Sequence, residues 1–78
     1  MFGFDRITAD PQILGGKACI RGRRISVSLL VNLVAKGMTI DEIIADYPDI
    51  EPEDIRQALQ YAAWTAADAV YRPEIAAA

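Results

Sequence analysis

The sequence contains no histidine, and its 78 residues include one cysteine, Cys19. Zinc and most other transition-metal sites draw their ligands from histidine and cysteine, so their usual ligand clusters cannot be assembled here. A lone cysteine also excludes an internal disulfide framework, which suits a reducing compartment. We therefore expect a cytoplasmic protein that holds no metal and no other cofactor.

Long apolar runs are missing as well. No stretch approaches the roughly 18 apolar residues that a membrane span needs, and the N-terminal MFGFDRITAD lacks the pattern of a signal peptide. We expect neither export nor membrane insertion. The chain is nevertheless 53% apolar, and a domain of this size hides only about 60% of the surface of its unfolded chain. One small domain over residues 1–78, with apolar surface left for a partner, follows from these numbers.

Charge is distributed unevenly around a net value of −3. Residues 1–26 carry an excess of basic side chains, whereas residues 27–78 are acidic. Half of all the basic residues fall within the stretch GGKACIRGRRISV, namely Lys17, Arg21, Arg23 and Arg24. Such a cluster predicts contact with an anionic group, either DNA phosphates or the acidic side chains of a protein or of a second copy.

Turn-forming residues punctuate residues 1–27, which we expect to form a β arm. In this arm Cys19 and Ile20 are expected to pair with residues 24–27 across the tight turn Arg21-Gly22-Arg23, which places the arginines at a hairpin tip and on its open face. After residue 27 the spacing of apolar residues becomes that of a helix, and a first helix is predicted over about residues 28–36. Its stripe consists of Leu29, Leu30, Leu33 and Val34, with Ser26 or Ser28 as N-cap and Gly37 after its end.

Two further helices are indicated by their caps. Thr39 and Glu42 form a capping box for a helix of about two turns that ends before Pro48, with Ile40, Ile43, Ile44 and Tyr47 on one face. Pro52 suits the first position of a third helix, which we expect to run to about Tyr71. Its predicted core stripe is Ile55, Leu59, Ala62, Ala66 and Val70, and residues 72–78 are expected to form a frayed tail.

Three helices over residues 28–71 with these connections match a mainly α helix-turn-helix domain preceded by a short β arm. In such a domain the third helix reads bases, and Arg56, Gln57 and Gln60 are the candidate DNA-reading residues. The same helix opens with Glu51, Glu53 and Asp54, whose charges oppose phosphate and complement the helix dipole. The third helix is therefore expected to be a poor reader.

Aromatic residues gather on another face of this helix. Tyr61, Trp64 and Tyr71 fall within about 80° of one another at the helical step. Tryptophan and tyrosine are preferred anchors of protein interfaces, so we predict that these three contact a protein partner or a second copy.

No catalytic arrangement is found. Gly15, Gly16 and Lys17 lack the further glycine and the following serine or threonine that a phosphate-binding loop requires, and Cys19 has no histidine to activate it. We expect neither an enzyme nor a small-molecule substrate.

Several stretches together resemble a family of small bacterial proteins, domain of unknown function 433. They are Asp10-Pro11, Gly15-Gly16-Lys17, Cys19-Ile20, Gly22, Arg24-Ile25, Val27, Gly37-Met38, Glu42-Ile43 and Asp46-Tyr47-Pro48. The resemblance implies a homeodomain-like helix-turn-helix and a VapB-like antitoxin that dimerises, binds a PIN-like ribonuclease toxin and represses its own operon. The chain departs from the family pattern at Ala18, Arg23 and Ser26.

Three interpretations remain open at this point. The arm cations of paired copies grip operator DNA, or the arm docks on the toxin or on the second copy, or the chain is a dimeric helical interaction module with neither DNA nor toxin as partner.

Overall fold

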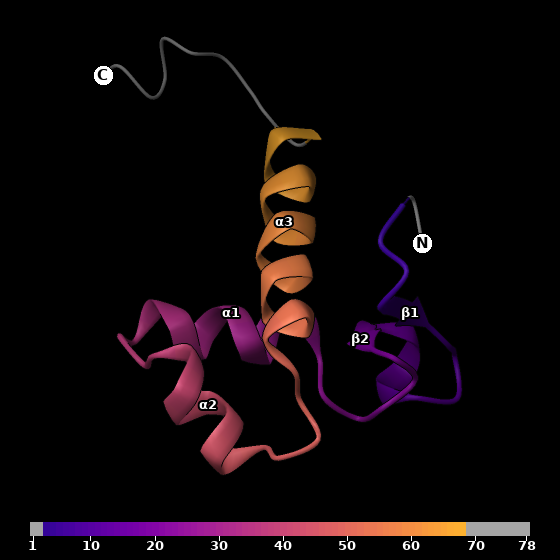
Figure 1. Cartoon of the computed structure of the whole chain (residues 1–78). Helices are drawn as coiled ribbons and strands as arrows, with labels where there is room; N and C mark the ends of the chain where they lie inside the picture. Colours follow the sequence, from indigo (N-terminus) through magenta and orange to yellow (C-terminus); the bar gives the residue numbers. More distant parts are fainter. Residues whose placement is uncertain (1–2, 69–78) are drawn as a thin grey trace, which may run out of the picture.

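A computed structural model describes residues 3–68, and Figure 1 draws the remaining residues as a thin grey trace. The fold is mainly α, with three helices and a short two-stranded sheet near the N-terminus, which confirms the expected fold class. In chain order the elements are β1 (Ile7–Ala9), a 3-10 turn η1 (Leu14–Gly16), β2 (Ala18–Ile20), α1 (Val27–Ala35), α2 (Ile40–Asp46) and α3 (Pro52–Asp68). Within residues 3–68, no helix combines the length and apolarity that crossing a bilayer demands.

The sheet pairs β1 with β2 in antiparallel register, with Ile7 opposite Ile20. The expected pairing of Cys19 and Ile20 across the arginine turn is reduced to one bridge, between Cys19 and Ser26, and one hydrogen bond, from the Ile20 amide to the Ile25 carbonyl. The strand cannot continue because the Ser26 side chain accepts a hydrogen bond from the Leu29 amide and begins α1. The main strand partner is therefore β1, which the sequence analysis did not identify.

Helix α1 ends as its sequence predicts. Gly37 lies at φ +94°, in the left-handed region that glycine adopts at low cost. The Gly37 amide donates to the Val34 carbonyl at 2.9 Å, and the Met38 amide donates to the Leu33 carbonyl at 3.2 Å. These two bonds form a Schellman motif, which satisfies the last carbonyls of the helix and turns the chain toward α2.

Helix α2 has the predicted capping box. The Glu42 amide donates to Thr39 Oγ1 at 3.1 Å, and the Thr39 amide donates to Glu42 Oε1 at 2.8 Å. Ile43 is fully buried, whereas Ile40, which was expected to face the core, is 44% exposed. The core contacts of α2 come from Ile43, Ile44 and the C-cap Tyr47, whereas Ile40 is the first residue of the helix and lies at its exposed end. The expectation that Ile40 shares the buried face is therefore wrong.

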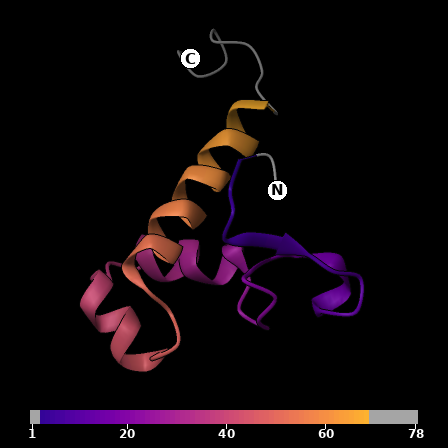
Figure 2. The same cartoon turned by 45° about the vertical axis from the view of Figure 1, so that its right-hand side comes forward.

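Helix α3 is the longest element and packs chiefly against α1. The two views of Figures 1 and 2 show its first turns against the other helices and its C-terminal half projecting beyond them. The buried core takes residues from every strand and helix: Ile7, Ile20, Val27, Leu30, Ile43, Ile50, Ile55 and Ala58.

The predicted core stripe of α3 is out of phase. Leu59 is 37% exposed and Ala66 is exposed, whereas Ala58 is fully buried. The small side chain of Ala58 suits a close approach between α3 and its neighbours, and the buried face follows Ile55, Ala58 and Ala62 rather than Leu59. Val70, Tyr71 and the predicted tail lie outside the described residues.

Candidate binding surfaces

A buried carboxylate joins the β arm to the start of α3. Asp54 is fully buried at the third position of the helix. Arg6 Nη1 donates to Asp54 Oδ1 at 2.9 Å, and Arg21 donates to both carboxylate oxygens, from Nε at 3.1 Å and from Nη2 at 2.8 Å. The Glu51 amide donates to Asp54 Oδ2 at 2.8 Å. Asp54 is therefore satisfied by two arginines and a helix N-terminus, and we call Arg6, Arg21 and Asp54 the arm hub.

The arm hub favours the ionised carboxylate. Burial by itself would raise the pKa of Asp54, but the hydrogen bonds from Arg21, from the Glu51 amide and from Arg6 outweigh it and hold that pKa below its usual value. The Asp54 hydrogen bond in turn raises the pKa of Arg21.

Arg21 therefore forms its ion pair and hydrogen bonds within its own chain. Its backbone lies at φ +46°, its amide donates to the Arg6 carbonyl at 2.8 Å, and its Nη2 also donates to the Asp49 carbonyl at 2.6 Å. The charge of Arg21 and the donors on Nε and Nη2 are thus used inside the fold. The prediction that Arg21 is an open anion-binding residue is not supported by this geometry.

Gln57 is likewise used inside the fold. It is 8% exposed, its Oε1 accepts a hydrogen bond from the Arg6 amide at 3.0 Å, and its Nε2 donates to Asp5 Oδ1 at 2.7 Å. A base-reading side chain must reach outward to a groove of the duplex. Gln57 instead ties the N-terminal segment to α3, which corrects its assignment as a DNA-reading residue.

The other candidate readers on α3 lie beside acids. Arg56 is exposed and forms a bidentate pair with Glu53, which holds the pKa of Glu53 at about 2. Gln60 is exposed. Glu51, with 58% of its side chain exposed, forms an ion pair with Arg6 at 2.6 Å. The acids at the start of α3 are therefore paired with arginines of the arm and of the helix itself.

Cations remain open on the arm. Lys17 and Arg24 are exposed, and within residues 3–68 neither forms an ion pair. Arg23 Nη1 lies 3.2 Å from Asp49 Oδ2, with 42% and 69% of the two side chains exposed. Ion pairs of this exposure contribute at most about 1 kcal/mol and exchange easily. We call Lys17, Arg23 and Arg24 the open arm cations.

The aromatic face predicted on α3 is partly folded inward. The Tyr61 ring meets the Phe4 ring edge-on at 5.5 Å between centroids, and Trp64 lies 6.3 Å from Phe4 and 5.8 Å from Tyr61. Tyr61 is half-buried against the core, while Trp64 is 41% exposed. Tyr71 lies outside the described residues. The N-terminal segment therefore covers one side of the rings, which sequence periodicity could not reveal.

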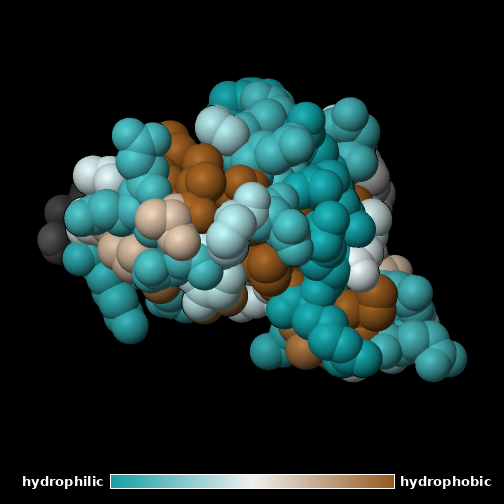
Figure 3. Space-filling model, turned by 60° about the horizontal axis from the view of Figure 1, so that its bottom comes forward, coloured by the Kyte–Doolittle hydropathy of each residue, from teal (hydrophilic) through white to brown (hydrophobic). Residues whose placement is uncertain are grey.

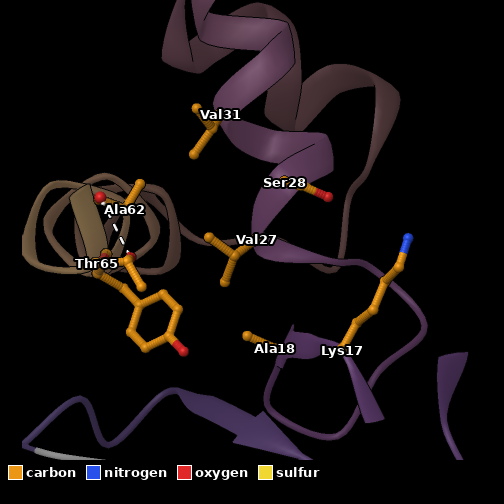
Figure 4. A pocket seen from close by; sticks show the side chains of 8 residues that line it. Lys17, Ala18, Val27, Ser28, Val31, Ala62 and Thr65 are labelled. Carbon is orange, nitrogen blue, oxygen red and sulfur yellow. Dashed lines mark hydrogen bonds between the residues drawn. The ribbon is translucent and has the colours of Figure 1, made fainter. Parts of the chain in front are cut away.

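A groove of about 440 Å³ lies between β2, α1 and the C-terminal half of α3. Its lining is almost entirely apolar or small: Lys17, Ala18, Val27, Ser28, Val31, Tyr61, Ala62 and Thr65. Figure 4 shows Ala62 and Thr65 of α3 facing Val27 and Val31 of α1 across the hollow, with the ammonium of Lys17 directed away from α3. We call this hollow the α3 groove.

Other apolar groups reach the surface singly. Leu14, Ile40 and Leu59 are exposed by 39%, 44% and 37%. The face in Figure 3 accordingly shows hydrophobic patches separated by hydrophilic residues. Scattered apolar exposure of this kind is normal for a small domain, whereas the α3 groove gathers apolar side chains from three elements. Among residues 3–68, no group of three histidine, cysteine, aspartate or glutamate side chains is placed to hold a metal ion.

Sequence reasoning missed Arg6, Asp54 and the α3 groove. Acids in the first turn of a helix have a local explanation in the helix dipole, so nothing in the local pattern marked Asp54 as buried. The usable signal was the pairing of basic residues before β1 and after β2 with an acidic helix start.

The fold defines a small, mainly helical domain with a basic arm and an apolar groove. A family model described as a protein of unknown function (DUF433) matches residues 7–62, and the chain belongs to this family. It is similar to an uncharacterized protein of Sinorhizobium fredii, y4eO, with 36% identity over 56 residues, which are 72% of this chain and 25% of that protein.

The fold is similar to the crystal structure of a DUF433 member from Anabaena variabilis. The TM-score is 0.71 at 36% identity, and the match covers 76% of this chain and 58% of that one. The chain thus spans about a quarter of y4eO and somewhat over half of the Anabaena protein.

Proposed function

We propose that this chain is the antitoxin of a type II toxin-antitoxin pair and that it neutralises a PIN-like ribonuclease by direct contact. Membership of the DUF433 family, with the resemblance described above, suggests this class of protein. The observation that carries the proposal is the state of the arm: Arg21 is fixed within the arm hub, while Lys17, Arg23 and Arg24 remain open.

Protein contact fits these charges better than base reading. The net charge of −3 disfavours a polyanion, and the candidate reader Arg56 is already paired with Glu53. A PIN-like active site, in contrast, is a local cluster of carboxylates. Arginine recognises a carboxylate through two parallel hydrogen bonds, so the open arm cations suit such a cluster and would block it.

The test is inhibition of the cognate ribonuclease by purified antitoxin. Arg24→Ala is expected to weaken inhibition by about tenfold or more, because it removes an exposed charge-assisted contact. Arg24→Lys should recover only part of the loss, since lysine lacks the planar fork. Lys36→Ala is the matched control, because it removes one exposed positive charge at the end of α1, away from the arm. Equal inhibition by the Arg24→Ala and Lys36→Ala proteins would contradict the proposal.

Repression of its own operon is the second part of the proposal, and the same cations carry it. Because Arg21 is held in the arm hub, two copies together present six open arm cations: Lys17, Arg23 and Arg24 from each copy. If all of these touched phosphate, log K for operator binding would fall against log salt with a slope of about −5. A slope near zero would contradict phosphate contact by the arms.

A further inference from the structure

The α3 groove has the size and the lining of a small-molecule site. Its volume of about 440 Å³ falls within the range of about 300–1,000 Å³ that is typical of such sites. Three elements supply apolar side chains to its walls, namely Ala18 of β2, Val27 and Val31 of α1, and Ala62 of α3. Water that lies against such walls is released when an apolar group replaces it, which favours the binding of a hydrocarbon.

Polar groups of the lining gather on one side of the groove. Figure 4 shows the Lys17 ammonium and the Ser28 hydroxyl on the side away from α3, and both residues are exposed. On the α3 side, the Thr65 hydroxyl donates to the Tyr61 carbonyl at 2.5 Å, so it is satisfied within its own helix. Covering Thr65 therefore leaves no unsatisfied hydroxyl. The groove thus runs from an apolar wall on α3 to a cationic edge next to β2.

Lys17 is available to an anion at this edge. It is the one lining residue that carries a charge, and none of the ion pairs found between residues 3 and 68 includes it. The strand residue after it, Ala18, pairs with Ala9 of β1, which fixes the point where the lysine stem leaves the backbone. A lysine stem packs along apolar surface while its ammonium stays in water. An anion bound there keeps partial contact with water.

The groove is small for contact with a folded protein. Eight residues line it, whereas a stable protein interface uses about 20–30 residues on each side. A small molecule with an apolar body and one anionic head matches both the apolar walls and the single ammonium. A doubly charged head would leave one charge without a partner, beside a chain whose net charge is −3. The chemistry of the lining therefore favours a monoanion, of which a carboxylate is the simplest.

We propose that the α3 groove binds a small amphipathic carboxylate of the medium-chain fatty acid type. The carboxylate pairs with the Lys17 ammonium, and the hydrocarbon body lies between α1 and the C-terminal half of α3. This binding goes beyond the antitoxin proposal and does not depend on it. A bound carboxylate neutralises one of the three open arm cations and leaves Arg23 and Arg24 to other partners.

The experiment titrates the purified full chain, labelled with ¹⁵N, with octanoate at neutral pH and follows the amide shifts by NMR. We expect a Kd below about 1 mM, as suits a ligand of this size. The largest shifts should fall on the groove lining: Lys17, Ala18, Val27, Val31, Ala62 and Thr65. Octanol lacks the charge and should bind about threefold more weakly, while octylammonium carries the opposite charge and should bind at least about tenfold more weakly.

Two pairs of variants separate the head from the body. Lys17→Gln should reduce the affinity for octanoate about threefold, to that for octanol, whereas Lys36→Gln removes a positive charge far from the groove and should change nothing. Ala62→Phe places a ring in the hollow and should weaken binding at least about tenfold. Ala63→Phe adds the same ring at an exposed position outside the lining and should bind normally. Circular dichroism shows whether each variant keeps its helices.

Three results would overturn the proposal. They are the absence of shifts up to about 10 mM octanoate, shifts centred outside the lining, and equal affinity for octanoate, octanol and octylammonium. The first two are read on the unmodified chain, so they do not depend on the folding of any variant. If the lining amides move with protein concentration alone, the occupant is a second copy, and if they move only when the ribonuclease is added, the occupant is the toxin; either outcome also overturns the proposal. Because octanoate is titrated without the ribonuclease, failure here leaves the antitoxin proposal to its own test.

Discussion

The two halves of α3 differ in what their side chains do: the first half makes polar contacts within the domain, and the second half presents an uncharged surface. In the first half, Asp54 and Gln57 bind the N-terminal segment and the arm through hydrogen bonds that cross most of the chain. In the second half, from Tyr61 to Ala67, the helix carries no charge and leaves the body of the domain. The polar network of the first half fixes one arrangement of the arm on α3, whereas the apolar surface of the second half is suited to contact with a partner.

The sharpest way to break the first half is Asp54→Ala. It leaves Arg6 and Arg21 without the buried carboxylate that both contact, and losing one side of a buried ion pair costs about 3–5 kcal/mol. For a domain of this size that is a large part of the free energy of unfolding. Urea denaturation followed by circular dichroism measures the change. Asp49→Ala, which removes the exposed partner of Arg23, should cost less than about 1 kcal/mol, and equal losses in the two variants would contradict the distinction.

Low pH should weaken the same network without a mutation, because it protonates Asp54. The pKa of Asp54 is lowered in the folded chain, so the ionised form stabilises the fold at pH values above about 4, the ordinary value for aspartate. That stabilisation is lost as the pH falls below the ordinary value toward the lower pKa of the folded chain. Carboxyl carbon shifts in an NMR titration should show Asp54 titrating below pH 3.8, its ordinary pKa. A midpoint at or above this value would argue against the ion pairs.

Phe4→Ala tests the junction between the halves. Phe4 packs edge-on against Tyr61 and beside Trp64, so its removal should cost about 1–2 kcal/mol, combining a lost aromatic pair with lost burial. Trp64 belongs to the uncharged half and is the only tryptophan in the chain. Its fluorescence emission should therefore shift to longer wavelength as water replaces the Phe4 ring. Unchanged emission would show that Phe4 does not shield it.

The second half should tolerate charge where it faces water. Ala63→Arg, on the side away from the α3 groove, should change the free energy of unfolding by less than about 0.5 kcal/mol, as exposed substitutions without special contacts do. Urea denaturation under the conditions used for Asp54→Ala gives the comparison directly. A loss comparable to that of Asp54→Ala would mean that both halves are equally bound into the domain.

Local signals carried most of the fold prediction. The Ser26 and Thr39 caps, the left-handed Gly37 and the break before Pro48 each depend on a few neighbouring residues, and the structure shows each of them. The phase of the α3 core face failed for a physical reason. Ala62 and Ala66 fit either of two stripes, because alanine is accepted at buried and exposed helix positions alike, and Leu59 then favoured the wrong one.

The binding surfaces were harder to predict because they depend on contacts between distant residues. Arg21 and Arg24 are the same residue type three positions apart, yet one is held by Asp54 and the other is open. Gln57 has the side chain of a base reader, but its position against the N-terminal segment uses both ends of its amide. Composition identified the basic arm, and only the fold separates the cations that stabilise it from those left for a partner.

The contact between Arg6 and Asp54 joins residues 48 positions apart. A contact at this separation requires closure of a long loop, whereas helices α1 and α2 depend on caps supplied by nearby residues. Docking of the arm on α3 is therefore expected to be a late step in folding. Until that step, the most basic segment of the chain is exposed to other anions.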